Sequence, residues 1–275
     1  MFNRIIVGVD GSPSSITASE FAFDLAKFWS IPVIGLYVSD IRLVEESFLA
    51  DLAGVLGFTY YEGISSKVRE FLEKQGDTVL EEFSARGREK GVAVSLVKTA
   101  GVPYREIYQQ ADPGDLIVVG RVGRKPIKGI LIGSNAEKVA RNARCPVAII
   151  PQRMGSPKKA LVAYDGGRSS FRSMEVCKTL KDLYDYEIHV LVVEEEEGDH
   201  KRLKEKVDQL LGEDYECHCL SGLPEERIVS FCREGSFDIL FLGAYGKGRL
   251  KEFFLGSVTS FVLNNLEVPM ILGRT

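Results

Sequence analysis

The chain has 275 residues, 45% of them hydrophobic and 27% charged, which suits one large globular domain or two ordinary ones. Its formal net charge of −4 argues against sequence-independent nucleic-acid binding, which depends on clustered lysine and arginine. We expect a cytoplasmic protein, because no apolar run approaches the roughly 18 residues of a membrane span and the N-terminus lacks a signal-peptide core.

From the N-terminus onward, short apolar runs rich in β-branched residues alternate with helical patterns. Runs such as "IIVGVD" and "LIVVG" are apolar throughout, which is typical of strands buried on both faces. The patterns between them, such as "SSITASEFAFDLAKFWS" and "SNAEKVARNARC", have helical periodicity. This alternation predicts right-handed crossovers, and therefore an α/β fold with a parallel sheet and helices on both of its faces.

The second part of the chain repeats the first in the same order. "RIIVGVDGS" at 4–12 matches "KALVAYDGG" at 159–167, and "DLIVVGRVG" matches "DILFLGAYG" further along. We therefore predict two domains, 1–151 and 157–275, each with about five strands. The stretch "QRMGSPK", which contains glycine, serine and proline, is the expected linker.

The first half carries an extra segment, at about residues 41–75, between its second strand and its third. Phe48, Leu49, Leu52 and Leu56 recur there at helical spacing. We predict that this segment is a helical insertion near the ligand-binding edge of the sheet. A further helical pattern, "TVLEEFSARGREKG", follows it.

Two loops share one frame, G-x-x-G, then nine residues, then G-S. They are "GRVGRKPIKGILIGS" (Gly120–Ser134) and "GAYGKGRLKEFFLGS" (Gly243–Ser257). Each follows a strand and opens a helix. Asp10 and Asp165 end the first strand of their halves, which a doubly wound strand order places beside these loops.

This frame predicts a phosphate site in each half. Glycine lets successive amides turn into one concavity, and a helix start presents free N–H groups at the positive end of its dipole. Both loops also contain basic residues, such as Arg121 in the first and Lys247 in the second. The alternative is that the loops serve packing alone, since a single G-x-x-G usually marks a turn.

At these residues the chain resembles the universal stress protein family in its tandem-domain form. The family's nucleotide motif is G-2x-G-9x-G-[ST], and both loops match it without a gap. The resemblance covers essentially the whole chain. It implies a Rossmann-like fold of the adenine-nucleotide alpha-hydrolase type, with a five-stranded parallel sheet in each domain, that binds ATP together with Mg²⁺.

The resemblance also implies roles for individual residues. Those that would contact the adenosine end are Asp10, Val38, Asp165 and Val193. The glycines that would wrap the phosphates are Gly120, Gly123, Gly133, Gly243, Gly246 and Gly256. The helix starts would add Ser134, Asn135, Ser257 and Val258.

The expected function is a nucleotide-dependent regulator or sensor in the stress response, with weak ATP hydrolysis at most. We find no catalytic base near either loop, because the three histidines lie elsewhere in the sequence. Asp10 or Asp165 could help to hold Mg²⁺, which would support slow turnover.

Two alternatives remain open. The first is a nucleotide-free scaffold that dimerises through its final strands, "CPVAIIP" and "VPMILG", which are apolar edges. In the family these strands pair between domains, so the resemblance implies an internal pseudo-dimer of the two halves, and we also expect a homodimer. The second is an ATP-pyrophosphatase or nucleotidyltransferase, because "YDGGRSS" faintly resembles a pyrophosphate loop.

The five cysteines are too few and too irregular for a disulfide framework. Cys145 and Cys177 lie in apolar or helical contexts and are expected to be core thiols. Cys217 and Cys219 flank His218, and on a strand both thiols would face one side and could form half of a zinc site, but no second Cys/His pair with ligand spacing completes it. We therefore predict a buried strand and no metal there.

Overall fold

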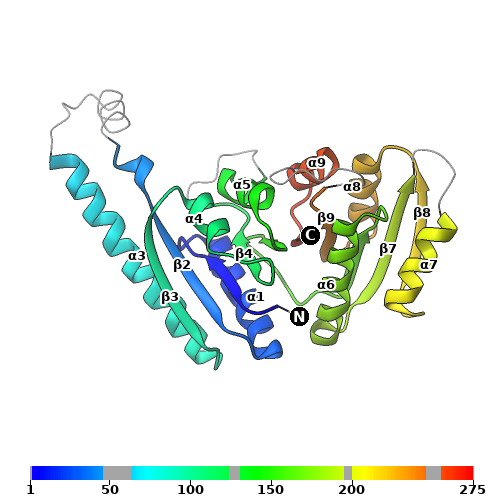
Figure 1. Ribbon diagram of the computed structural model, residues 1–275, viewed down its shortest axis with the longest axis horizontal. Helices are drawn as coiled ribbons and strands as arrows, with labels where there is room; N and C mark the ends of the chain where they lie inside the picture. The colour runs from blue at the N-terminus through cyan, green and yellow to red at the C-terminus, as the bar shows by residue number, and fades with distance from the viewer. Residues whose placement is uncertain (1, 46–62, 124–130, 195–199, 246–254, 275) are drawn as a thin grey trace.

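The computed structural model of the chain, shown in Figure 1, describes residues 2–45, 63–123, 131–194, 200–245 and 255–274. Strands and helices alternate along both halves. The elements of the first half are β1 (Ile5–Gly8), α1 (Pro13–Trp29), β2 (Val33–Asp40), η1 (Ile41–Leu43), α3 (Gly63–Glu89), β3 (Val94–Gly101), α4 (Pro103–Gln109), β4 (Leu116–Gly120), α5 (Ser134–Asn142) and β5 (Val147–Ile150). Those of the second are β6 (Lys159–Ala163), α6 (Arg168–Tyr184), β7 (Glu187–Glu194), α7 (His200–Leu211), β8 (Glu216–Ser221), α8 (Pro224–Glu234), β9 (Ile239–Gly243), α9 (Ser257–Asn265) and β10 (Met270–Gly273).

The ten strands of the described residues belong to one sheet, in the order β3-β2-β1-β4-β5-β10-β9-β6-β7-β8. Within each half the five strands are parallel, which confirms the predicted fold class. The halves meet at β5 and β10, which pair antiparallel with Ile271 opposite Ala148. Because these final strands cover each other, they are not free edges, and the scaffold alternative loses the feature on which it rested.

Each face of the sheet has its own hydrophobic core. Successive residues of a strand point to opposite faces, so Ile5 and Val7 enter one core while Ile6 enters the other. Helices α1, α3, α6 and α7 contribute to the first core, and α4, α5, α8 and α9 to the second. Figure 1 shows α3 and α7 at opposite ends of the molecule.

The insertion of the first half differs from its prediction. Instead of an excursion that ends near residue 75 and a separate helix after it, α3 is continuous over Gly63–Glu89. The predicted apolar face at residues 48–56 lies outside the described residues. Leu80 and Phe83 of α3 are buried in the first core, so one long helix covers the sheet where two shorter ones were expected.

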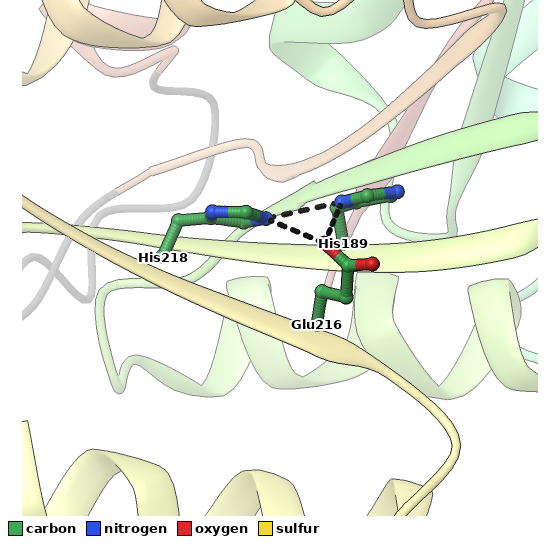
Figure 2. A group of neighbouring side chains, drawn as sticks. All are labelled: His189, Glu216 and His218. Atoms are coloured by element: carbon green, nitrogen blue, oxygen red, sulfur yellow. Dashed lines mark hydrogen bonds and ion pairs between the residues drawn. The ribbon is translucent and has the colours of Figure 1, made fainter.

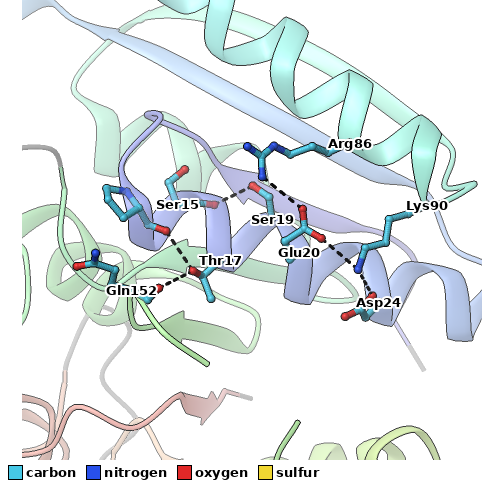
Figure 3. A network of polar contacts seen from close by, with 9 residues as sticks. Ser15, Thr17, Ser19, Glu20, Asp24, Arg86, Lys90 and Gln152 are labelled. Atoms are coloured by element: carbon cyan, nitrogen blue, oxygen red, sulfur yellow. Dashed lines mark hydrogen bonds and ion pairs between the residues drawn. The ribbon is translucent and has the colours of Figure 1, made fainter. Parts of the chain in front are cut away.

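Ion pairs also join α1 to Arg86 of α3 and to Lys90, the residue that follows α3, as Figure 3 shows. Lys90 Nζ lies 2.6 Å from Asp24 Oδ1 and 3.1 Å from Glu20 Oε2, and Arg86 lies 3.7 Å from Glu20. Partly exposed pairs of this kind contribute little each, typically about 0–1 kcal/mol, so the buried apolar face of α3 carries most of its docking energy.

The cysteines divide into buried and accessible thiols, and we expect chemical labelling to show this. Cys145, Cys177 and Cys232 are buried, and burial raises the pKa of each thiol to about 12. Cys219 is exposed, whereas burial raises the pKa of half-buried Cys217 to about 11. In native protein a thiol reagent at pH 8 should modify Cys219 quickly and the three buried thiols only after unfolding, because the thiolate is the reactive form. Fast modification of a buried thiol, read by peptide mass spectrometry, would contradict this packing.

No helix within the described part of the chain is both long enough and apolar enough to cross a membrane.

Candidate functional site

A cavity of about 700 Å³ opens at the carboxyl ends of the first-half strands. Every residue that the sequence placed in the first site lines it: Asp10, Val38, Gly120, Gly123, Gly133, Ser134 and Asn135. The parallel order puts β1 between β2 and β4, so the ends of all three strands converge there with the start of α5.

The start of α5 lacks a side-chain cap. Its N-cap is Gly133, which has no side chain to accept from the first turn, and the first helical bond runs from Glu137 N to Gly133 O at 3.1 Å. The amides of Ser134, Asn135 and Ala136 therefore have no partner within the helix. At the start of α1, by contrast, the side chain of Ser12 accepts from Ser15 N.

The glycines of the first loop differ in how closely neighbouring atoms approach them. A Cβ on Gly120 would stand 2.6 Å from Ser15 N and 2.7 Å from Ser14 Oγ, so this glycine is required for β4 to approach α1. A Cβ on Gly123 would meet one atom closely, Asp10 Oδ2 at 3.3 Å. The amide of Gly133 donates to Arg121 O at 2.8 Å and is already used. Packing thus explains Gly120, whereas among the described residues a Cβ on Gly123 would contact only the Asp10 carboxylate.

Two polar side chains that line the first cavity have oxygen atoms able to accept hydrogen bonds. One carboxylate oxygen of Asp10 accepts from Ser12 N at 2.8 Å, which fixes the side chain at the end of β1. Asn135 Oδ1 is buried and has no hydrogen-bond partner among the described residues. A buried acceptor without a donor costs roughly 1–3 kcal/mol, so a bound molecule that donates to it would be favoured.

Sequence reasoning missed part of the wall of this cavity. Leu72 and Gln75 of α3 line it together with Tyr37, whose hydroxyl lies 3.2 Å from both Leu72 O and Gln75 Oε1. Asn264 of α9 lines it from the other half. These residues approach through tertiary packing, and no local pattern in the sequence marks them.

The second half has a smaller cavity, about 230 Å³, in the corresponding place. Its lining includes six of the predicted residues: Asp165, Val193, Gly243, Gly256, Ser257 and Val258. Gly246, the remaining one, lies outside the described residues, as does Lys247.

The second site repeats the local geometry of the first. Asp165 Oδ1 accepts from Gly167 N at 2.8 Å, and Gly256 N donates to Ala244 O at 2.8 Å. Gly256 caps α9 without a side chain, so the first helical bond is Ser260 N to Gly256 O. A Cβ on Gly243 would stand 2.8 Å from Ser170 N, as at Gly120. Ligand cavities in proteins are typically about 300–1,000 Å³, so the first cavity has ligand size and the second is tighter.

Arg121 was predicted to be one of the basic residues near a bound phosphate, but in the structure its side chain contacts the other half of the protein. Its side chain is buried, 2% of the residue is exposed, and its guanidinium donates to Leu131 O and to the carbonyls of Leu263 and Leu266. The last two belong to the end of α9, in the other half. Carbonyls at a helix C-terminus carry partial negative charge, so they suit a cation. Burial lowers the pKa of Arg121 to about 10, and the group is charged at neutral pH.

A second arginine makes the reciprocal contact. Arg274, which follows β10, is 5% exposed and donates to Ala140 O near the end of α5. Its guanidinium carbon also lies 5.6 Å from the centre of the Tyr245 ring, which lines the second cavity. Each helix that begins at one cavity is therefore held at its other end by an arginine of the opposite half.

Comparison with known proteins identifies the family. The model of the universal stress protein family matches residues 1–151 and 185–274. The chain belongs to the universal stress protein family. Among its relatives, universal stress protein Slr1230 of Synechocystis is 25% identical over 286 residues, which cover 98% of this chain and 99% of that protein. Universal stress protein YxiE of Bacillus subtilis is 33% identical over 152 residues, 54% of this chain and 99% of that protein.

The fold of this universal stress protein is shared with solved structures. A universal stress protein from Archaeoglobus fulgidus superposes with a TM-score of 0.76 at 22% identity, over 100% of this chain and 99% of that one. The protein PA1789 of Pseudomonas aeruginosa gives a TM-score of 0.70 at 17% identity, over 99% and 92% of the two chains. The family and its tandem form support a role in the stress response.

Proposed function

We propose that this universal stress protein binds ATP, together with Mg²⁺, in the cavity of each half and acts as a nucleotide-dependent regulator or sensor. The observation that carries this proposal is the uncapped start of α5 at the mouth of a ligand-sized cavity. A helix start with three unpaired amides and a positive dipole end is suited to a phosphate. The same arrangement recurs at α9.

The first cavity offers a place for each part of the nucleotide. The amides of Ser134 and Asn135, with the backbone at Gly123, would bind the phosphates. The free Asn135 Oδ1 accepts a hydrogen bond, and Val38 provides an apolar wall for the adenosine end. Asp10 would contact the ribose or hold Mg²⁺ through its carboxylate.

The second cavity would bind through Asp165, Val193, Ser257 and Val258 in the same roles, with the glycines of its loop around the phosphates. Its smaller volume predicts weaker binding than in the first half. We expect regulation rather than rapid catalysis, because the known lining of either cavity includes carboxylates but no histidine that could act as a general base.

Two measurements test this function. Protein purified without added nucleotide should release adenine nucleotide on denaturation, detected by chromatography of the supernatant. Titration of nucleotide-free protein with MgATP in a calorimeter should show a tighter site, assigned to the first half, and a weaker one. Ser134→Pro serves as a matched variant, since it removes an amide at the first helical position, where proline is tolerated.

The proposal fails if purified protein neither carries adenine nucleotide nor binds MgATP in the titration while it melts cooperatively. It also fails for the first cavity if the Ser134→Pro variant binds with unchanged affinity. Hydrolysis of ATP at ordinary enzyme rates would show that the protein is an ATPase and not a regulator.

A further inference from the structure

A cluster of three possible metal ligands lies on the second half, away from both cavities. His189 is on β7, and Glu216 and His218 are on the neighbouring strand β8, as Figure 2 shows. The parallel register sets Glu216 opposite His189, and His218 follows two residues later on the same face. None of the three lines either cavity.

The distances between the ligand atoms suit one tetrahedral metal ion. His189 Nδ1 lies 3.0 Å from His218 Nε2 and 3.4 Å from Glu216 Oε2, and His218 Nε2 lies 3.7 Å from that same oxygen. Two ligand atoms each about 2.0–2.2 Å from a tetrahedral Zn²⁺ lie about 3.3–3.5 Å apart. The observed triangle brackets these values, so small shifts would bring all three atoms onto one ion.

The surroundings hold the two imidazoles in place. His189 is 7% exposed, and its ring packs edge-on against Phe237 at 5.0 Å between ring centres. The ring of His218 lies 4.8 Å from that of Phe231 on α8. Rings fixed by packing lose little freedom when they bind an ion, which favours a preformed site.

The outer nitrogen of His189 has a carboxylate nearby. Its Nε2 is buried with no hydrogen bond in the described part of the chain, and it lies 3.8 Å from Glu187 Oε2. A histidine that binds a metal through one nitrogen usually donates its other N–H to a carboxylate or carbonyl, which orients the ring. Glu187 can serve this purpose once Nδ1 is a metal ligand.

The sequence predicted a buried strand and no metal at this position. The prediction of a buried strand is wrong, because β8 is the edge strand of the sheet and its residues are exposed or half-buried. Cys217 and Cys219 alternate with His218 along β8, so the thiols share the opposite face of the sheet. The expectation that both thiols face one side therefore agrees with the strand, but His218 joins His189 and Glu216 instead.

We propose that His189 Nδ1, His218 Nε2 and the Glu216 carboxylate bind a divalent first-row metal ion, with Zn²⁺ preferred. Two imidazoles and one carboxylate are a donor set typical of zinc, and copper or nickel would compete by affinity. The fourth position faces solvent, because the side chain of Glu216 is 70% exposed, and water would occupy it.

Equilibrium dialysis with Zn²⁺ tests the site, using the full chain with both Cys217→Ser and Cys219→Ser as the host. These changes remove the other soft ligands of β8 and should leave one Zn²⁺ bound per chain. His218→Asn and Glu216→Gln in that host should each weaken binding by at least about tenfold, and Glu187→Gln by a similar or smaller factor. The control Glu213→Gln removes an exposed carboxylate just before β8 and should change nothing.

Cobalt distinguishes the ligand types. Co²⁺ added to the host should give the visible absorption of a four-coordinate ion without a thiolate charge-transfer band, and His218→Asn should abolish it. The proposal is overturned if the host binds no zinc at a stoichiometric level, or if the two serine changes alone remove the zinc that the unaltered chain binds. Equal zinc affinity in the host and in the His218→Asn variant would show that His218 is not a metal ligand and that the two histidines form only a hydrogen-bonded pair.

Discussion

Replacing Gly123 with valine should weaken MgATP binding at the first cavity by at least about tenfold, or roughly 1.4 kcal/mol, without unfolding the protein. The new Cβ would lie 3.3 Å from Asp10 Oδ2 and would meet no backbone atom of the described residues closely, so this part of the chain can accept it with a small shift of the Asp10 side chain. The rest of the side chain would occupy the space between Asp10 and the start of α5, where the phosphates are proposed to lie. Calorimetric titration and a thermal melt measure the two effects.

Gly120→Ala is the matched control in the same loop. Its Cβ would meet Ser15 N and Ser14 Oγ at 2.6 and 2.7 Å, so the strand and α1 must separate. Overpacking of this kind costs about 1–3 kcal/mol, and Gly120→Ala should lower the melting temperature where Gly123→Val does not. If Gly123→Val binds MgATP normally, the loop is not part of the phosphate site.

Arg121→Ala should destabilise the chain by about 3 kcal/mol or more, which corresponds to a loss of roughly 6–12 °C in melting temperature. Its guanidinium donates to three carbonyls, and those of Leu263 and Leu266 lie at the end of α9, where Arg233 donates only to the carbonyl of Asn265 among the described residues. Alanine would leave the carbonyls buried and unpaired and would open a cavity between the halves.

Arg121→Lys is the control for charge. An ammonium group keeps the charge but cannot reach all three carbonyls in the geometry of a guanidinium, so the loss should be intermediate. An Arg121→Ala variant as stable as the unaltered protein would mean that burial of the charge cancels its hydrogen bonds. The contact would then contribute nothing to the association of the halves.

Local features of the sequence were sufficient for the framework of the fold. Apolar strands such as Leu116–Gly120 and the paired Asp-Gly turns predict a parallel sheet with Asp10 and Asp165 at its carboxyl edge, because these rules depend on periodicity and strand order. The helix start itself could also be predicted, but its cap could not: a Gly-Ser pair favours serine as the N-cap, whereas in α5 Gly133 takes that position and Ser134 is the first helical residue.

Features that depend on distant contacts could not be predicted. Arg121 looks like an anion ligand in the sequence, but the antiparallel pairing of β5 with β10 brings the end of α9 within its reach. His189 and His218 meet only through the register of β7 and β8. The approach of α3 to the first cavity likewise depends on a helix longer than its sequence pattern indicates.

Hydrogen–deuterium exchange in the presence and absence of MgATP tests the central claim most directly, because it reports on the amides themselves. Amides without a helical partner exchange quickly, and bound phosphate oxygens would slow them. We predict slower exchange at Ser134, Asn135 and Ala136, with a weaker effect at the start of α9 and none at the start of α1, where Ser12 already provides a cap. Saturating MgATP binding that leaves the exchange of these amides unchanged would contradict the account.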